Sequence, residues 1–125
     1  MDIETLRRYC LSLPQATEGI QWGSDLLFRI GGKMFAVVAL ERTPISIAFK
    51  CTPEEFAELI EREGIIPAPY MARNHWVFLE SLDVLTRAEL KRLIKDSYGM
   101  VAAKLTKKVQ AQLGIISKSA LARKR

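Results

Sequence analysis

The sequence predicts a two-layer α+β domain, with helices packed on a mainly antiparallel sheet of four to five strands. Residues 26–50 hold short stretches that alternate in the manner of strands and are separated by turn residues. Three other stretches carry the apolar spacing and the N-terminal caps of helices. Together these elements give the order α-β-β-β-α-(β)-β-α. A length of 125 residues, 49% of them hydrophobic and 26% charged, fits one globular domain.

The first helix is predicted over residues 2–13. Asp2 can cap its first turn, and Pro14 cannot continue it. Residues 15–23 are predicted to form a loop. The apolar positions of the helix recur at spacings of three and four, which gives one buried stripe formed by Ile3, Leu6, Cys10 and Leu13.

Three strands are predicted over residues 26–30, 33–40 and 45–50. The Gly31-Gly32 pair forms a two-residue hairpin turn, because both glycines tolerate positive φ. Both faces of these strands carry apolar residues, so either a helix or a second copy of the chain must cover the second face. The residues expected on that second face are Val37, Ala39, Ala48, Val77 and Leu79.

The second helix is predicted to begin at Thr52 and Pro53, with Glu55 completing a capping box. Residues 65–74 contain two prolines and are expected to form a stiff loop, with room for a short strand at its start. A further strand is predicted over residues 75–80, where apolar side chains again occupy both faces.

A long last helix is predicted from a second capping box, formed by Thr86 and Glu89. Its apolar stripe continues without a break to Leu113, just before a glycine suited to end a helix. Residues 1–113 are therefore assigned to the domain, and residues 114–125 to a basic C-terminal tail.

The net charge of +5 comes from the C-terminal end of the chain. Residues 1–103 hold 12 basic and 14 acidic residues, a net charge of −2, whereas residues 104–125 hold seven basic residues and no acid. A polyanionic partner is therefore expected to bind a basic arm at the C-terminal end of the chain rather than a basic groove in the domain. Three interpretations of this arm stay open: contact with phosphates, docking of its apolar stripe on the domain or an anionic membrane surface, and a solvated tail without a partner.

The sequence carries no catalytic or metal-binding motif. His75 is the only histidine, and a nucleophilic site would need folding to bring Cys10, Cys51 or a serine beside it. One histidine and two distant cysteines do not make a tetrahedral metal site. We therefore expect a non-enzymatic protein that uses no cofactor and no metal.

Two further features bear on where the protein works. The cysteines show no CxxC spacing, and the first residues lack the apolar stretch of a signal peptide. No apolar run approaches the roughly 20 residues that span a bilayer. These features favour a reduced, cytoplasmic environment and argue against a membrane span.

One short segment combines the residue types that contact nucleic acids. Arg73, Asn74 and His75 stand together beside Trp76, and cationic, amide and aromatic side chains contact phosphates, base edges and base faces respectively. Trp76 and Trp22 are nevertheless expected to pack in the core or at its rim. The predicted contact residues are Lys33, Lys50, Arg73, Asn74, His75, Trp76, Lys107 and Lys108.

Two motifs are the most distinctive in the chain: Gly-Gly-Lys-Met-Phe at residues 31–35 and the His75-Trp76 pair. With these motifs, residues 6–105 resemble the MmcQ/YjbR family. The resemblance implies the order α-β(3)-α-β(2)-α of the secretion-chaperone-like two-layer domains, a DNA-binding role through a double-wing arrangement, and no enzyme activity or cofactor. Other matching residues are Leu13-Pro14, Glu18, Trp22-Gly23, Phe28, Ala36, Ile47, Lys50, Pro53-Glu54-Glu55, Ile66-Pro67-Ala68, Met71 and Ser97-Tyr98.

The sequence departs from the family pattern just before His75. The family commonly has a His-Met-Asn-Lys run there, whereas residues 70–74 of this chain read Tyr-Met-Ala-Arg-Asn. Arg73 keeps a positive charge, so contact with phosphate is expected to remain while base contacts differ. The expected partner is DNA, bound mainly electrostatically and with little sequence preference. The alternative is a protein partner or a homodimer that uses the second sheet face, and no small-molecule ligand is indicated.

Overall fold

The computed structural model describes residues 1–69 and 71–114, apart from the side chain of Arg73. This part of the chain folds into one six-stranded antiparallel sheet with four α-helices, which confirms the predicted α+β class. The elements are α1 (Ile3–Ser12), β1 (Thr17–Gln21), β2 (Asp25–Ile30), β3 (Lys33–Ala39), β4 (Ser46–Lys50), α2 (Pro53–Leu59), β5 (Ile65–Pro67), the 3₁₀ turn η1 (Ala72–Asn74), β6 (Trp76–Leu79), α3 (Arg87–Ala103) and α4 (Lys107–Leu113).

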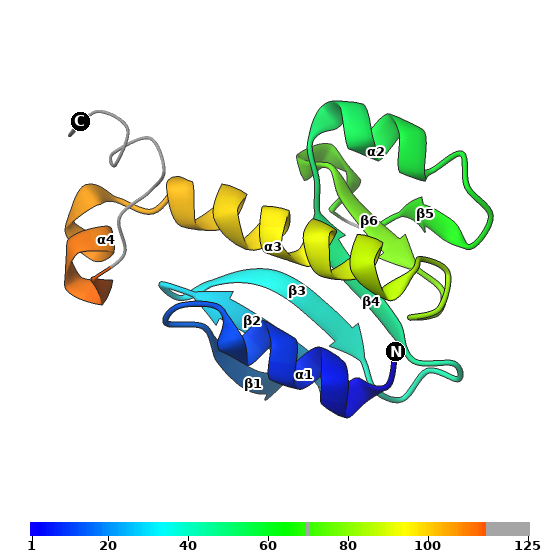
Figure 1. Cartoon of the computed structure of the whole chain (residues 1–125), viewed down its shortest axis with the longest axis horizontal. Coiled ribbons are helices and arrows are strands. Elements are labelled where there is room, and N and C mark those ends of the chain that lie inside the picture. The colour runs from blue at the N-terminus through cyan, green and yellow to red at the C-terminus, as the bar shows by residue number, and fades with distance from the viewer. Residues whose placement is uncertain (70, 115–125) are drawn as a thin grey trace.

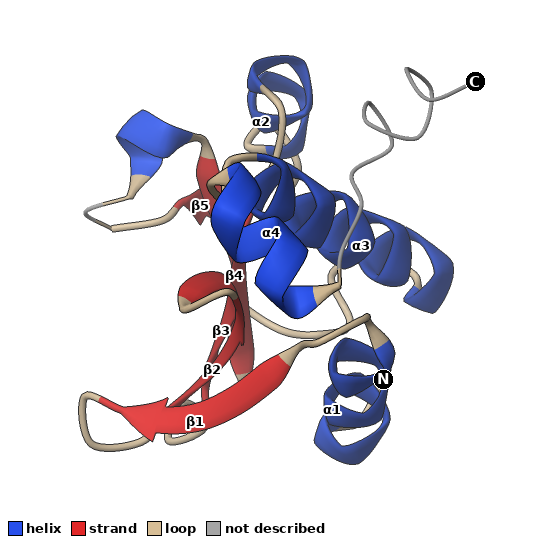
Figure 2. Ribbon diagram, turned by 90° about the vertical axis from the view of Figure 1, so that its left-hand side faces the viewer, coloured by secondary structure: helices blue, strands red, loops and turns tan. Residues whose placement is uncertain are grey.

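The sheet has the strand order β1-β2-β3-β4-β6-β5, and every neighbouring pair is antiparallel. The first four strands follow one another as a meander, and the chain then passes through α2 before it adds β5 and β6. Helices α1 and α3 lie side by side over one face of the sheet (Figure 1), which makes two layers. Figure 2 shows the layers edge on, with the strands to one side and α1 and α3 to the other.

The segment before β2 is a strand and not the predicted loop. Residues of β1 pair with β2 from Thr17 to Gln21 in regular antiparallel register. Glycine, glutamate and glutamine have low strand propensity, so the partner strand and not the local sequence fixes this conformation. The prediction that Trp22 packs in or beside the core is therefore wrong: β1 carries it to a turn at the sheet edge, where Trp22 is 67% exposed.

The main core lies between the sheet and helices α1 and α3. Val77 and Leu79 of β6 are fully buried in it, although alternation was expected to place them on the second face. Trp76 and Phe78 join the second face instead. Both sides of β6 are apolar, so its alternation predicts the period of the strand but not which side meets the core. The largest fully buried side chains are Phe28, Phe35, Phe49, Leu6, Leu27, Ile30, Ile47, Ile65, Leu79, Leu90, Leu93 and Ile94.

A smaller apolar cluster lies on the second face of the sheet. Leu27, Val37 and Ala48 are buried there together with Trp76 and Ala68. Ala68 directly follows β5, and Met71 of the same connection packs against the cluster. A loop of the same chain thus covers part of the face for which the sequence suggested a helix or a second copy.

The predicted long last helix is two helices. Helix α3 ends at Ala103, and Thr106 caps α4 by accepting a hydrogen bond of 3.2 Å from the backbone N–H of Val109. The apolar spacing continues across the break, so it does not reveal the change of direction. Figure 1 shows α4 turned away from the axis of α3 at its C-terminal end. The predicted basic tail at residues 114–125 lies outside the described residues beyond Gly114.

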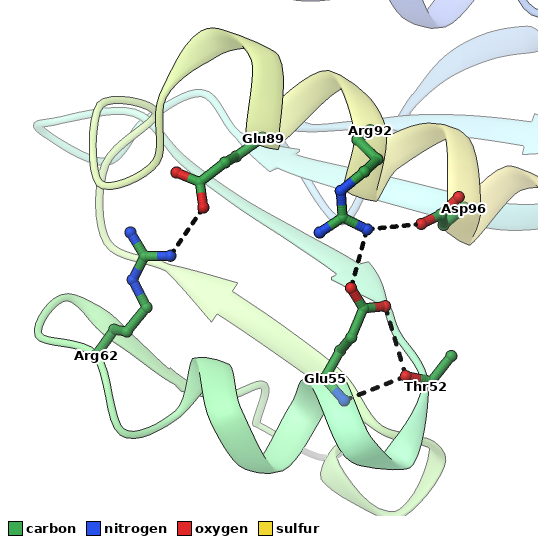
Figure 3. Close-up of polar contacts among 6 residues, drawn as sticks. All are labelled: Thr52, Glu55, Arg62, Glu89, Arg92 and Asp96. Atoms are coloured by element: carbon green, nitrogen blue, oxygen red, sulfur yellow. Dashed lines mark hydrogen bonds and ion pairs between the residues drawn. The ribbon is translucent and has the colours of Figure 1, made fainter.

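Ion pairs tie α2 to α3 across the surface (Figure 3). Arg62 donates to Glu89 at 3.0 Å, and Arg92 donates to both Glu55 and Asp96 at 3.0 Å. Exposed pairs of this kind each contribute at most about 1 kcal/mol. They orient α2 beside α3 and occupy several of the carboxylates of this region.

Ser97 joins the two layers at one buried point. Its hydroxyl donates a hydrogen bond of 2.7 Å to the carbonyl of Phe35 in β3 and accepts one of 3.0 Å from the N–H of Lys50 in β4. The ladder between these strands stops at the Ala36–Phe49 pair, so the hydroxyl stands where the next strand-to-strand bonds would form. Ser97 therefore satisfies two backbone groups that the diverging strands leave open.

Tyr98, the next residue, anchors the other side of α3. Its hydroxyl donates a hydrogen bond of 2.6 Å to the carbonyl of Pro14, which follows α1. Its ring stands edge-on to Phe35, with 5.4 Å between the ring centres. The Ser97-Tyr98 pair thus fixes α3 against both the sheet and α1. No helix among the described residues is both long and apolar enough to cross a lipid bilayer.

Replacing Ser97 with alanine is expected to lower the free energy of unfolding by about 1–3 kcal/mol, because the carbonyl of Phe35 and the N–H of Lys50 lose their buried partner. Urea unfolding followed by circular dichroism measures this change. Ser12→Ala is the matched control, since Ser12 is exposed and should change stability by less than about 0.5 kcal/mol. Equal effects of the two substitutions would contradict the role assigned to Ser97.

Candidate functional site

A pocket of about 480 Å³ opens where the β2–β3 turn, the ends of β4 and η1, and the α3–α4 junction meet. Small-molecule sites in proteins generally have volumes of roughly 300–1,000 Å³. The lining of the pocket combines three lysines with several apolar side chains. Its lining residues are Gly31, Lys33, Met34, Lys50, Asn74, Trp76, Val101, Lys104, Leu105, Thr106 and Val109.

Helix α3 presents one face to this pocket. Ser97, Val101 and Lys104 are spaced by four and three residues, so they lie above one another on the same side of the helix. Ser97 holds the backbone of Lys50, and Val101 and Lys104 follow along the same face into the pocket. The bond that fixes α3 on the sheet therefore also places Lys104 beside the end of β4.

The β2–β3 turn closes the pocket from the other side. Gly31 has a φ of 57°, and a Cβ at this position would lie 2.6 Å from Leu105 Cδ1 and 3.2 Å from Val109 Cγ1. Only glycine combines this backbone conformation with so close an approach. Gly31 is thus a packing surface for Leu105 and Val109 as well as part of a hairpin turn.

Lys50 and Lys104 bring two positive charges together. The ammonium group of Lys50 donates a hydrogen bond of 3.1 Å to the carbonyl of Asn74. Burial lowers the pKa of Lys50, and the neighbouring charge of Lys104 lowers it further. An ammonium group has three N–H donors, and one bond leaves donors for a ligand. An anion between the two lysines would relieve their mutual repulsion.

Among the described residues, no carboxylate lines the pocket. In the same part of the chain, the ion pairs engage Arg7, Arg62, Arg92 and the N-terminal amine, and none involves the three pocket lysines, Lys33, Lys50 and Lys104. The field at the pocket is therefore positive even though residues 1–103 sum to −2.

The structure brings together four of the predicted contact residues. Lys33, Lys50, Asn74 and Trp76 all line the pocket, although they come from three separate stretches of sequence. Lys33 and Asn74 are exposed, Lys50 is half-buried, and Trp76 is 6% exposed and contributes to the wall. The residues predicted as dispersed contacts thus converge on one place.

Lys107 and Lys108 are exposed in the first turn of α4, directly after Thr106, which lines the pocket. They follow a pocket residue in the chain but do not line the pocket. Arg73 lies in η1, and its side chain is outside what the structure describes.

His75 is directed away from the pocket. Its ring stands edge-on to Phe56 of α2, with 5.5 Å between the ring centres. Its backbone adopts a left-handed φ of 63°, and its carbonyl accepts a 3.0 Å bond from the N–H of Cys51. His75 therefore fixes the turn that presents Asn74 to Lys50.

The sequence did not single out Lys104, Met34 or the apolar residues of the α3–α4 junction as parts of a site. Lys104 was counted only within the basic arm. A usable signal was the Thr106-Lys107-Lys108 stretch, because a threonine before a new helical turn is a typical N-cap. Interpreting Thr106 as the start of a new helix would have placed the end of the preceding helix beside Lys104.

The two thiols are poor candidates for a nucleophile. Burial raises the pKa of Cys10 to about 12 and that of Cys51 to about 12. A thiol with so high a pKa is almost entirely protonated at neutral pH, and the thiolate is the reactive form. Among the described residues, no three histidine, cysteine, aspartate or glutamate side chains cluster as a metal site would require.

Comparison with known proteins places the chain in a family. The family model described as YjbR matches residues 11–100, which is most of the chain and includes β1 to β6 and most of α3. The chain belongs to the YjbR family. The resemblance drawn from the Gly-Gly-Lys-Met-Phe and His-Trp motifs is confirmed.

Comparisons of sequence and of structure each find proteins similar to this YjbR protein over most of its length. It is similar to the uncharacterized protein YbdF of Escherichia coli O157:H7, with 29% identity over 88% of this chain and 92% of that one. The crystal structure of Deinococcus radiodurans protein DR2400, described as a DUF419 domain, is similar with 28% identity and a TM-score of 0.82, covering 91% of this chain and 88% of that one. A Pseudomonas syringae protein at 22% identity, covering 81% of this chain and 99% of that one, shares the fold with a TM-score of 0.66.

Replacing Lys104 with glutamine is expected to raise the pKa of Lys50 toward 10.5, because one of the two main causes of its lowering is removed while burial stays. NMR titration of the Lys50 side chain measures this shift. A lowered lysine pKa means that the unfolded chain binds more protons, so this group makes stability increase as the pH rises toward 10.5, and the variant should show less of that increase.

Arg87→Gln is the matched control, because it removes one exposed positive charge at the far end of α3. It should leave the pKa of Lys50 unchanged. A Lys50 pKa that does not respond to Lys104→Gln would contradict the proximity of the two lysines.

Proposed function

We propose that this YjbR protein binds nucleic acid, with DNA as the expected partner, and that it does so without enzymatic activity. The observation that carries the proposal is the convergence of Lys33, Lys50 and Lys104 on one pocket, whose described lining contains no carboxylate. Phosphate contacts by lysine supply most of the affinity of proteins that bind nucleic acid with little sequence preference. The proposal therefore predicts strong salt dependence and weak base readout.

The arrangement extends beyond the pocket. Lys107 and Lys108 directly follow the pocket residue Thr106 and add two exposed charges on α4, so the proposal includes five lysines. This geometry differs from the expected basic arm, because three of the five lysines line a concave surface.

The non-enzymatic part of the proposal rests on the placement of the reactive groups. His75 packs against Phe56, and burial keeps the pKa of both thiols near 12. Ser97 donates its hydroxyl proton to a backbone carbonyl and accepts from a backbone N–H. These groups serve the fold, and the lysines of the pocket are suited to holding an anion.

The alternative partner, a second copy bound through the second sheet face, has weaker support. Leu27, Val37, Ala48 and Trp76 on that face are already buried within the chain. A homodimer there and a cytoplasmic location both remain predictions. Sedimentation velocity tests the first, since a concentration-independent monomer would contradict it.

The double substitution Lys50→Gln/Lys104→Gln is expected to weaken binding of a short DNA duplex by about tenfold or more at low salt. The slope of log K against log salt should become shallower by about 0.9 for each phosphate that the variant no longer neutralises. Fluorescence anisotropy across a salt series measures both quantities.

Arg87→Gln serves as the control, because Arg87 is exposed and lies at the opposite end of α3. It should keep the affinity and slope of the unsubstituted protein. If only overall charge matters, Arg87→Gln, which removes one charge, should lower log K by about half as much as the double variant, which removes two. That result would contradict a specific role of the pocket, and salt-independent binding would contradict the proposal.

A further inference from the structure

The pocket carries more apolar surface than phosphate contact needs. Met34 and Trp76 line it from the strands, and Val101, Leu105 and Val109 line it from the α3–α4 junction. If the lysines contacted only the phosphates of a duplex, they could bind them equally well from a flat surface, without an apolar pocket. These apolar lining residues therefore indicate a ligand with an apolar or aromatic part next to its negative charge.

The cationic and the apolar lining residues together limit the kind of ligand that fits. A wholly apolar molecule would strip water from Lys50 and Lys104 without replacing the lost hydrogen bonds, which is costly. A small inorganic anion would engage the lysines and leave the apolar wall unused. An anion joined to a flat ring system engages both the lysines and the apolar lining residues.

We infer that the pocket receives one nucleoside monophosphate unit, with its phosphate between Lys50 and Lys104 and its base against the wall formed by Met34, Trp76 and Leu105. This inference rests on the proposed function and deepens it, since it makes an unpaired nucleotide the preferred ligand. A base inside a duplex is stacked on both sides and cannot enter a pocket, whereas an unpaired base can. Single strands and frayed or overhanging ends are therefore bound more tightly than intact duplex.

A free nucleotide and an unpaired nucleotide within a strand offer the pocket the same chemistry. Calorimetric titrations with dAMP, deoxyadenosine and inorganic phosphate measure whether the pocket binds a free nucleotide more tightly than either of its parts. Titrations with a single strand and with the duplex of the same length measure whether it prefers an unpaired nucleotide within a strand. We expect dAMP to bind at least about tenfold more tightly than deoxyadenosine or phosphate, and the single strand to bind more tightly than the duplex by a similar factor.

Two variants connect these results to the pocket. Val101→Phe fills space in the pocket without changing its charge. Lys104→Gln removes a lysine proposed to bind the phosphate, and the variant should still fold because Lys104 is exposed. Both should reduce dAMP binding by about tenfold or more. Val101→Phe should also remove the preference for single strands while leaving salt-dependent duplex binding in place. Ile66→Phe, an exposed apolar site on β5, is the matched control and should change none of these values.

The outcomes separate the two proposals. Binding of dAMP without binding of either oligonucleotide overturns nucleic-acid binding and supports a free nucleotide as the ligand of the pocket. Equal affinity for single strand and duplex, together with dAMP no tighter than phosphate, overturns the nucleotide pocket and leaves the electrostatic function standing. Full dAMP binding by a folded Lys104→Gln variant also overturns the assignment of the phosphate.

Discussion

The buried hydroxyl of Ser97 is the contact on which the arrangement of the site depends. It binds a carbonyl of β3 and an N–H of β4 at the point where the two strands part. This fixes the rotation and the height of α3 on the sheet. Since Val101 and Lys104 lie on the same face of the helix, the same bond sets their position relative to Lys50. One hydrogen-bonding side chain thus links the core to the pocket.

The distribution of charge follows from this framework. Arginines of α1, α3 and the turn after α2 pair with carboxylates of β1, α2 and α3, as the Arg92 contacts in Figure 3 illustrate. The lysines of β3, β4 and the α3–α4 junction gather around a pocket that no acid lines in the described part of the chain. Net charge alone would assign the positive character to the chain terminus, but local placement also creates a cationic pocket in a body that is close to neutral. An anionic ligand responds to the local field.

The features that depend on neighbouring residues could be predicted from the sequence. The N-caps at Asp2, Thr52 and Thr86 are confirmed, as is the positive-φ Gly31-Gly32 turn, because each is decided by bonds within a few residues. The β1 strand was missed because only pairing with β2 makes its polar sequence extended. The side of β6 that faces the core was assigned wrongly, since both of its sides are apolar.

Part of the candidate site could also be predicted from the sequence. Lys33, Lys50, Asn74 and Trp76 were named from residue type and motif, and they do converge. Lys104 was missed because the apolar stripe runs unbroken across the end of α3, and only the packing of Leu105 on Gly31 shows that the chain turns there.

The central claim is that anionic ligands bind at the pocket between Lys50 and Lys104. A map of backbone amide shifts in NMR spectra, recorded while a short oligonucleotide is added, tests it most directly. The account predicts the largest shifts at Lys33, Lys50, Asn74, Trp76 and Lys104. Shifts centred on α1, or confined to residues after Gly114, would contradict it.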